Sequence, residues 1–143
     1  MKVRKASSKD RKKITELYLG LYPYWKNKFK KKKIPLESKV KKIILLAEDK
    51  KEVVGFCWAN YIQYGFSRFG YIEELFVSEN SRKKGVGAAL VKKAVKELKK
   101  MKVAAIFVTT GKKNKKAIRL YKSAGFKLTR GQWLFWTAQK RKR

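Results

Sequence analysis

The stretch from Gly70 to Ala88 constrains this chain more than any other part of its sequence. It reads as an apolar strand that carries two carboxylates, followed by a basic loop and by two glycines that open a helix. Backbone N–H groups around Gly85 and Gly87 can close on an anion, and the positive dipole end of the helix favours the same ligand. The cationic run Arg82-Lys83-Lys84 adds charge, so the sequence predicts a site for a pyrophosphate group.

Two other phosphate-binding motifs fit this stretch poorly. A dinucleotide-binding fingerprint needs a small residue three positions after its second glycine, and Leu90 stands there. A P-loop needs Gly-Lys followed by Ser or Thr, which this sequence lacks. The structural alternative is a glycine-containing turn that only starts a helix.

Length and composition predict one domain over residues 1–143, with a short basic tail at 139–143. No apolar run approaches the roughly 18 residues of a membrane span, so we expect no membrane contact. The first residues lack the apolar segment of a secretory signal. The one cysteine, Cys57, has apolar neighbours and is expected to be a buried thiol. We therefore expect a cytoplasmic protein.

The sequence contains no histidine, which excludes several kinds of chemistry. Ser-His-Asp and Cys-His catalysis and histidine general bases are ruled out. With one thiol and no imidazole, we also expect no metal site. Acid–base chemistry must come from the ten carboxylates, from tyrosine, from lysine or from water.

The net charge of +30 is extreme for 143 residues and favours contact with polyanions. Non-specific contact with nucleic acid is one expectation. A source whose proteins are generally rich in lysine explains the charge equally well, and composition does not separate the two.

Hydrophobic periodicity predicts an alternation of strands and helices. Ser7 and Asp10 resemble a capping box at the start of a helix that ends before Pro23, and residues 24–33 read as an exposed basic connection. Further helices are expected at 35–42, 87–101 and 114–124. The expected strands are 3–6, 43–47, 53–64, 71–77, 103–108, 126–128 and 132–138. The run 103–108 is apolar throughout, which suits a strand covered on both faces and parallel to 71–77.

Two motifs within this pattern resemble a known family. The run Arg-x-x-Gly-x-Gly from Arg82, after a strand that ends Leu75-Phe76-Val77, resembles motif A of the GNAT superfamily of acyl-CoA-dependent N-acetyltransferases. The helix Asn114-x-x-Ala117-x-x-x-Tyr121-x-x-x-Gly125-Phe126 resembles its motif B. The resemblance implies an α/β GNAT fold, with a mixed central sheet of about seven strands flanked by about four helices.

The resemblance also implies acetyl-CoA as co-substrate and a set of residues that hold it. These are Leu75, Phe76, Val77, Arg82, Lys83, Lys84, Gly85, Val86, Gly87, Ala88, Asn114, Ala117 and Tyr121.

Transfer of acetyl to an amine requires a base, a polarised carbonyl and a protonated leaving thiolate. By resemblance, Tyr121 donates the proton, and an amide near Val77 could polarise the carbonyl. The strand with Glu73 and Glu74 is similar to that of diamine and polyamine acetyltransferases, which implies Glu73 as base and Glu74 as a substrate contact. Tyr71 acting through water is the alternative to Glu73.

The resemblance thus implies an acetyl-CoA-dependent N-acetyltransferase, and the acceptor stays open. The positive field disfavours free polyamines and suits a lysine or N-terminal amine of a protein, for example a basic protein on nucleic acid. A small diamine or polyamine and an aminoglycoside-like amine are the alternative acceptors. A rival of another class is a catalytically silent nucleic-acid-binding module, with basic patches between aromatic residues. The sequence does not decide between a monomer and a homodimer.

Overall fold

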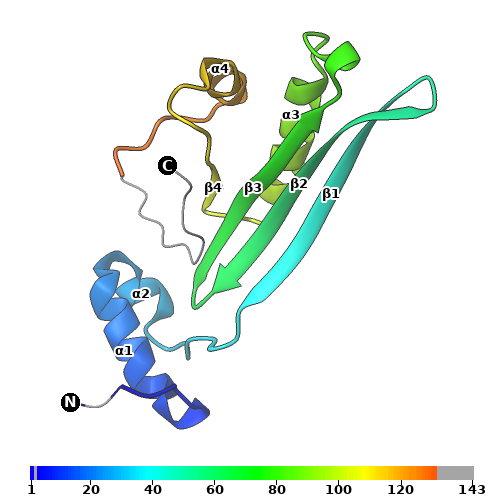
Figure 1. Cartoon of the computed structure of the whole chain (residues 1–143). Helices are drawn as coiled ribbons and strands as arrows, with labels where there is room; N and C mark the ends of the chain where they lie inside the picture. The colour runs from blue at the N-terminus through cyan, green and yellow to red at the C-terminus, as the bar shows by residue number, and fades with distance from the viewer. Residues whose placement is uncertain (2, 132–143) are drawn as a thin grey trace.

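The computed structural model describes residue 1 and residues 3–131, and its strands form one mixed sheet in the order β1-β2-β3-β4. The first three strands form an antiparallel meander, and the fourth runs parallel to the third (Figure 1). Their bounds are β1 Lys39–Asp49, β2 Glu52–Tyr64, β3 Ser67–Val77 and β4 Ala105–Val108.

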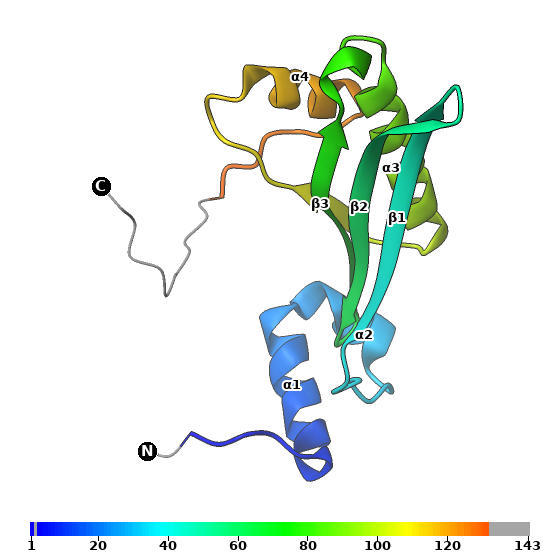
Figure 2. The same cartoon turned by 45° about the vertical axis from the view of Figure 1, so that its right-hand side comes forward.

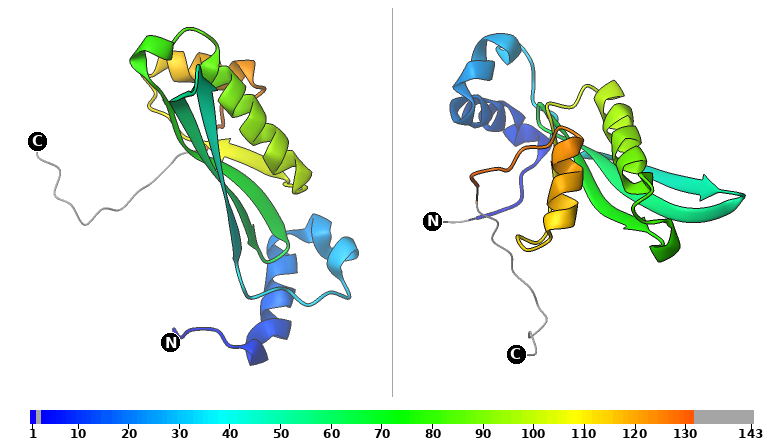
Figure 3. Two further views of the ribbon diagram at one scale, coloured as in Figure 1. Left: turned by 90° about the vertical axis from the view of Figure 1, so that its right-hand side faces the viewer. Right: turned by 90° about the horizontal axis from the view of Figure 1, so that it is seen from above.

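Four α-helices accompany the sheet in the described residues, and one of them forms the core with it. They are α1 Arg11–Leu21, α2 Lys26–Phe29, α3 Val86–Lys100 and α4 Lys115–Ser123. Short 3₁₀ turns lie at Ser8–Asp10, Pro23–Trp25 and Glu79–Ser81. Helix α3 runs along one face of the sheet, whereas α1 and α2 lie beyond the end where β2 turns into β3 (Figures 2 and 3). Within the described residues, no helix is long and apolar enough to cross a bilayer.

The core lies between α3 and the sheet. Every second residue of β2 from Cys57 to Tyr61 is buried beneath the helix, which buries four residues of its own in return. Those four are Leu90, Val91, Ala94 and Leu98. The helix approaches so closely that a Cβ added at Gly70 would lie 2.7 Å from Leu98 Cδ1. Cys57 is fully buried, as expected, and burial raises the pKa of its thiol to about 11.

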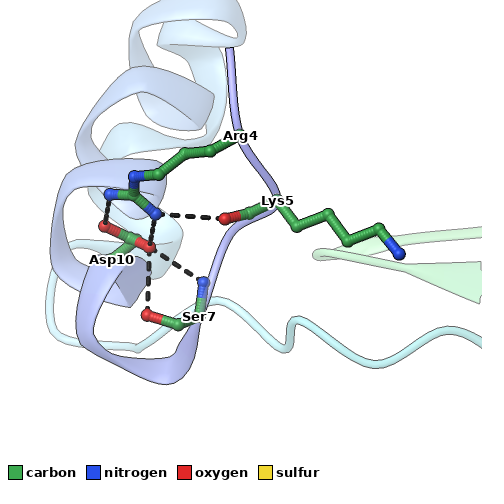
Figure 4. Close-up of polar contacts among 4 residues, drawn as sticks. All are labelled: Arg4, Lys5, Ser7 and Asp10. Carbon is green, nitrogen blue, oxygen red and sulfur yellow. Dashed lines mark hydrogen bonds and ion pairs between the residues drawn. The ribbon is translucent and has the colours of Figure 1, made fainter. Parts of the chain in front are cut away.

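The chain enters α1 through a polar cluster (Figure 4). Asp10 accepts a hydrogen bond from the Ser7 backbone N–H at 2.8 Å, as the capping-box prediction requires. The Arg4 guanidinium donates to both oxygens of Asp10, at 2.8 and 2.9 Å. These bonds favour the charged form and hold the pKa of Asp10 well below its usual range. The contact therefore weakens only when the pH falls below the range in which carboxyl groups normally titrate.

The prediction of about seven strands is not met in the described residues, where four strands are present. Residues 3–6 do not pair with the sheet, and the Arg4 side chain binds Asp10 and the Lys5 carbonyl instead. Residues 126–128 are also not a strand. The expected strand 132–138 and the basic tail 139–143 lie outside the described residues.

Three element boundaries also differ from the prediction. The helix expected at 35–42 is wrong, because residues from Lys39 onward continue the β1 ladder against β2. The basic connection 24–33 contains the short helix α2, whose Phe29 ring packs on the preceding Trp25. Strand β4 is half-buried rather than covered on both faces, since α3 lies on one side only. The predicted parallel unit β3–α3–β4 is confirmed.

Candidate acyl-transfer site

A β-bulge in β3 sets the position of the two predicted carboxylates. Trp58 of β2 pairs with Glu74, whereas the next residue, Ala59, pairs with Ile72, so Glu73 is an extra residue in β3. Ile72 faces α3 and is buried, and Glu74 lies beside Trp58 on the opposite, open face. The alternation that would send adjacent side chains to opposite faces is therefore broken at Glu73, and the bulge leaves both carboxylates exposed.

Strands β3 and β4 part at the same position. Their parallel pairing runs from Phe69 to Ile72 and stops where the bulge begins. Beyond it, the free edge of β3 faces the end of the molecule that holds α4 and the start of α3 (Figure 1). Ser78 N–H donates to Val54 of β2, so the preceding amide, that of Val77, points to the free edge. The amide predicted to polarise a carbonyl is thus available at this edge.

The start of α3 has the backbone geometry that an anion site needs. Ala89 N–H donates to Gly85 C=O at 3.0 Å, so the amides of residues 85–88 precede the first hydrogen bond of the helix. Lys83 and Gly85 both have positive φ, of 60° and 80°, which turns successive amides into a concave arrangement. A Cβ at Gly85 would meet nothing within 4 Å. Arg82, Lys83 and Lys84, which directly precede Gly85, are exposed, and the Arg82 Nε donates to the Val77 carbonyl at 3.0 Å.

A shallow hollow lies on the other side of this loop, against the β1–β2 hairpin. Its lining includes Glu48 and Asp49 together with Lys84 and Gly85. The carboxylates would repel a phosphate, so this hollow does not suit the diphosphate of coenzyme A. The predicted anion site is instead expected on the side of α3 that faces α4.

Helix α4 closes the junction from that side. A Cβ on Gly87 would lie 3.4 Å from Leu120 of α4 and 3.7 Å from Val77, so three elements meet at this glycine. Leu75 points to the same place, whereas the side chain of Phe76 stacks against Phe56 on the open face. Of the three predicted cofactor contacts in β3, Phe76 is therefore the one whose side chain lies away from this junction.

The first residues of α4 have a structural role as well as their predicted one. The side-chain oxygen of Asn114 accepts from the Ala117 N–H at 3.1 Å and caps the helix. Only the amide nitrogen of Asn114 is left for a ligand. Ala117 is half-buried one turn before Tyr121, on the same side of the helix.

Tyr121 is half-buried against the core, and its ring lies edge-on to Phe126. Burial raises the pKa of its hydroxyl, and the charges of Cys57 and Glu74 raise it further. The hydroxyl therefore stays protonated at neutral pH and can donate a hydrogen bond. Because the charge of Glu74 contributes to this pKa shift, the Tyr121 hydroxyl and the Glu74 carboxylate interact electrostatically.

Sequence reasoning missed one residue of this site, Asn60. Its Nδ2 donates to Glu73 Oε1 at 3.1 Å from the neighbouring strand. Asn60 pairs directly with Tyr71, so the predicted base and its predicted alternative lie on one patch of the open face. An isolated asparagine within a strand carries no signal of such a contact, because the bulge that creates it is a feature of strand register.

The sequence from residue 11 to residue 126 matches the profile of the Acetyltransferase (GNAT) family. The chain belongs to this family. Its predicted membership is thus confirmed, and the match covers both the loop at residues 82–87 and helix α4 of this GNAT acetyltransferase.

Individual proteins agree with this assignment. GCN5-related N-acetyltransferase 6, chloroplastic, of Arabidopsis thaliana is 34% identical over 73 residues, which cover 51% of this chain and 25% of that protein. The match therefore spans only a quarter of the relative. An aminoglycoside acetyltransferase from an uncultured soil metagenomic sample, in complex with trehalose, superposes with a TM-score of 0.62 at 20% identity over 87% of this chain and 90% of that one.

A second solved structure, aminoglycoside N-acetyltransferase AAC(6')-Iy in complex with CoA, superposes with a TM-score of 0.60 at 17% identity. The alignment covers 69% of this chain and 77% of that one. At such identities the likeness shows the fold. The fold of this GNAT acetyltransferase is therefore established independently of its acceptor.

Proposed function

We propose that this GNAT acetyltransferase transfers the acetyl group of acetyl-CoA to a primary amine, and that the amine belongs to a lysine or to the N-terminus of a protein. The observation that carries the proposal is the junction of β3, α3 and α4. A concave set of amides, a free strand edge and a protonated tyrosine converge there, next to two exposed carboxylates.

The residues present suit the diphosphate of coenzyme A. The amides of residues 85–88, with Arg82, Lys83 and Lys84 around them, would hold it. Leu75, Val77 and Ala117 would border the acyl arm from β3 and α4. Acetyl-CoA, when bound, supplies the activated acetyl thioester.

Glu73 is the proposed base. An alkylamine has a pKa of about 10.4 and must lose a proton before it can attack. The Asn60 amide holds the carboxylate of Glu73 from one side and leaves its second oxygen for the acceptor or for water. Glu74, beside Trp58, is placed to attract the cationic amine before the proton leaves.

Two further groups act on the other side of the reacting bond. The Val77 N–H points to the free edge of β3 and would donate to the carbonyl oxygen as negative charge develops on it. The Tyr121 hydroxyl would donate to the departing sulfur, and its raised pKa keeps the proton in place for this step.

The exposed position of Glu73 and Glu74 supports an acceptor carried by a protein. Sites for small molecules are concave and bury most of their ligand. The two carboxylates are instead exposed on a sheet face that is open within the described residues, where a protruding lysine can reach them. The net charge of +30 also repels free small cations.

A small diamine or polyamine is the second candidate. Neither Glu73 nor Glu74 forms an ion pair within the described residues, although the chain carries 40 basic residues. Two unpaired carboxylates beside the indole of Trp58 would suit a diamine, because a ring face attracts ammonium groups.

Binding of acetyl-CoA is tested first, by the shift in melting temperature. Saturating acetyl-CoA should stabilise the wild type by about 2.7 kcal/mol at a hundred times its Kd. Gly87→Glu should abolish the shift, because it brings a carboxylate to the start of α3. Gly87→Gln matches its size without the charge and should retain part of the shift. An equal shift in all three folded proteins would contradict the assignment.

The acceptor is tested by consumption of acetyl-CoA against basic proteins, lysine peptides, spermidine and an aminoglycoside. Preferred turnover of proteins or peptides is expected. Preferred turnover of spermidine, lost in Glu74→Gln, would establish the second candidate instead.

A further inference from the structure

The end of the molecule opposite the start of α3 carries a second distinctive surface, built from residues 22–33 (Figures 1 and 2). We call it the lysine–aromatic surface. Its lysines are all exposed. They are Lys26, Lys28, Lys30, Lys31, Lys32 and Lys33.

The charge of this surface is not neutralised locally. The sequence has no acidic residue between Glu16 and Glu37. None of the six lysines forms an ion pair with any described residue, whereas lysines on α1 and α3 do so with Glu16 and Glu97. The surface therefore presents concentrated positive charge that no described carboxylate neutralises, and it would attract anions.

Aromatic rings give this charge a fixed support. Trp25 packs edge-on to Phe29 with 5.7 Å between ring centroids, and Phe29 stacks on Phe66 of the β2–β3 turn at 4.2 Å. The ammonium groups of Lys28 and Lys32 lie 5.5 and 5.7 Å from the centre of the Phe29 ring. These contacts hold two of the six lysines, Lys28 and Lys32, against the aromatic cluster.

One ring of the cluster differs from the others. Tyr24 makes T-shaped contacts with Tyr22 and Trp25, and the residue is 70% exposed. An exposed ring among ordered lysines provides a stacking face for a base beside donors for phosphates.

We propose that the lysine–aromatic surface binds single-stranded nucleic acid, with its lysines on phosphates and a base stacked on Tyr24. Duplexes keep their bases paired and offer no free face for stacking. An anionic membrane would need several apolar side chains to insert, but most rings here pack on one another. The proposal is independent of acetyl transfer, because the surface lies at the other end of the sheet.

Fluorescence anisotropy with a labelled 20-nucleotide oligo(U) tests the proposal, between 50 and 200 mM salt. The triple variant Lys30→Gln/Lys31→Gln/Lys33→Gln leaves the two lysines on Phe29 in place. The matched control Lys92→Gln/Lys96→Gln/Lys99→Gln removes the same charge from exposed positions of α3. The first variant should lose at least about tenfold in affinity, and its salt slope should fall by about 2, since each phosphate contact contributes about 0.7.

The control variant should lose less than about threefold, and both should keep the acetyl-CoA shift in melting temperature. Equal losses in the two variants would overturn the proposal, because they indicate only the general charge of the protein. Stronger binding to phosphatidylserine vesicles than to oligo(U), lost in the first variant, would overturn it in favour of a membrane.

Tyr24 provides an independent test. Tyr24→Ala should weaken oligo(U) binding at least about fivefold with an unchanged salt slope, and Tyr24→Phe should not, because only the ring is needed for stacking. A Tyr24→Ala protein that binds as tightly as the wild type would remove the stacking step and overturn the proposed site.

Discussion

The two faces of the sheet differ in what their residues do. The face beneath α3 is closed, and Cys57, Ala59 and Ile72 there are at most 1% exposed. The opposite face is open in the described residues, with Ile44 at 52% and Phe76 at 50% exposure. The carboxylates of the candidate site belong to the open face and its edge. The residues that stabilise the fold and the candidate catalytic carboxylates therefore lie on different sides of the same strands.

The bulge at Glu73 determines which side chains of β3 lie on each face. A regular β3 would continue its alternation from Ile72 and direct Glu74 into the core beneath α3. The extra residue shifts the register, keeps Leu75 and Val77 toward α3, and leaves both carboxylates outside. A one-residue irregularity therefore suffices to combine a closed core with two exposed carboxylates, those of Glu73 and Glu74.

Replacing the carboxylates should give the largest effect on activity. Glu73→Gln should lower the rate by about 10²–10⁴-fold at neutral pH, the usual contribution of a general base, and leave the melting temperature unchanged. Part of the rate should return at high pH, where more of the amine is already deprotonated. Steady-state rates across pH provide the measurement.

Glu74→Gln is the matched control and should raise KM for the acceptor more than it lowers kcat. A larger kcat loss in Glu74→Gln, with the same rescue at high pH, would assign the base to Glu74. Asn60→Ala should reproduce a weaker form of the Glu73→Gln effect, since it removes the hydrogen bond that holds the base.

The same truncation on the two faces should separate their roles in stability. Ile72→Ala, at 1% exposure, should cost about 2–5 kcal/mol of unfolding free energy, because it leaves a cavity beneath α3. Ile44→Ala, at 52% exposure, should cost less than about 1 kcal/mol. Urea denaturation measures both. Similar costs at the two positions would mean that the open face is covered in solution.

Tyr121 of α4 packs against the core beside the candidate site and provides the next test. Tyr121→Phe keeps the ring against Phe126 and removes only the hydroxyl, so acetyl-CoA affinity should hold while turnover falls about 10²-fold. Because burial raises the pKa of this hydroxyl, loss of wild-type turnover from tyrosine ionisation should begin only above the pH range in which tyrosine usually titrates. A turnover loss below threefold, with chemistry rate-limiting, would indicate a packing role alone.

The sequence predicted the parts of this molecule whose signal is local. Periodicity placed α3 and α4 within a residue or two at each end, and the glycine pattern predicted where α3 begins. Register carries no such local signal. The bulge, the Asn60–Glu73 contact and the departure of residues 3–6 from the sheet depend on which strands pair, and these were missed. The prediction at 35–42 failed for the same reason, since sheet pairing overrode a proline-based helix start.

The smallest expected effect comes from the β1–β2 turn, which belongs to neither face. Lys50 and Lys51 form its two-residue loop with φ of 48° and 69°, a left-handed conformation that suits Asn-Gly far better than lysine. Lys50→Asn/Lys51→Gly should therefore stabilise the fold by about 1 kcal/mol without changing turnover. Lys50→Gln/Lys51→Gln removes the same charge without the conformational relief. If this control gains as much in urea denaturation, the stabilisation comes from reducing the net charge of +30 and not from the turn.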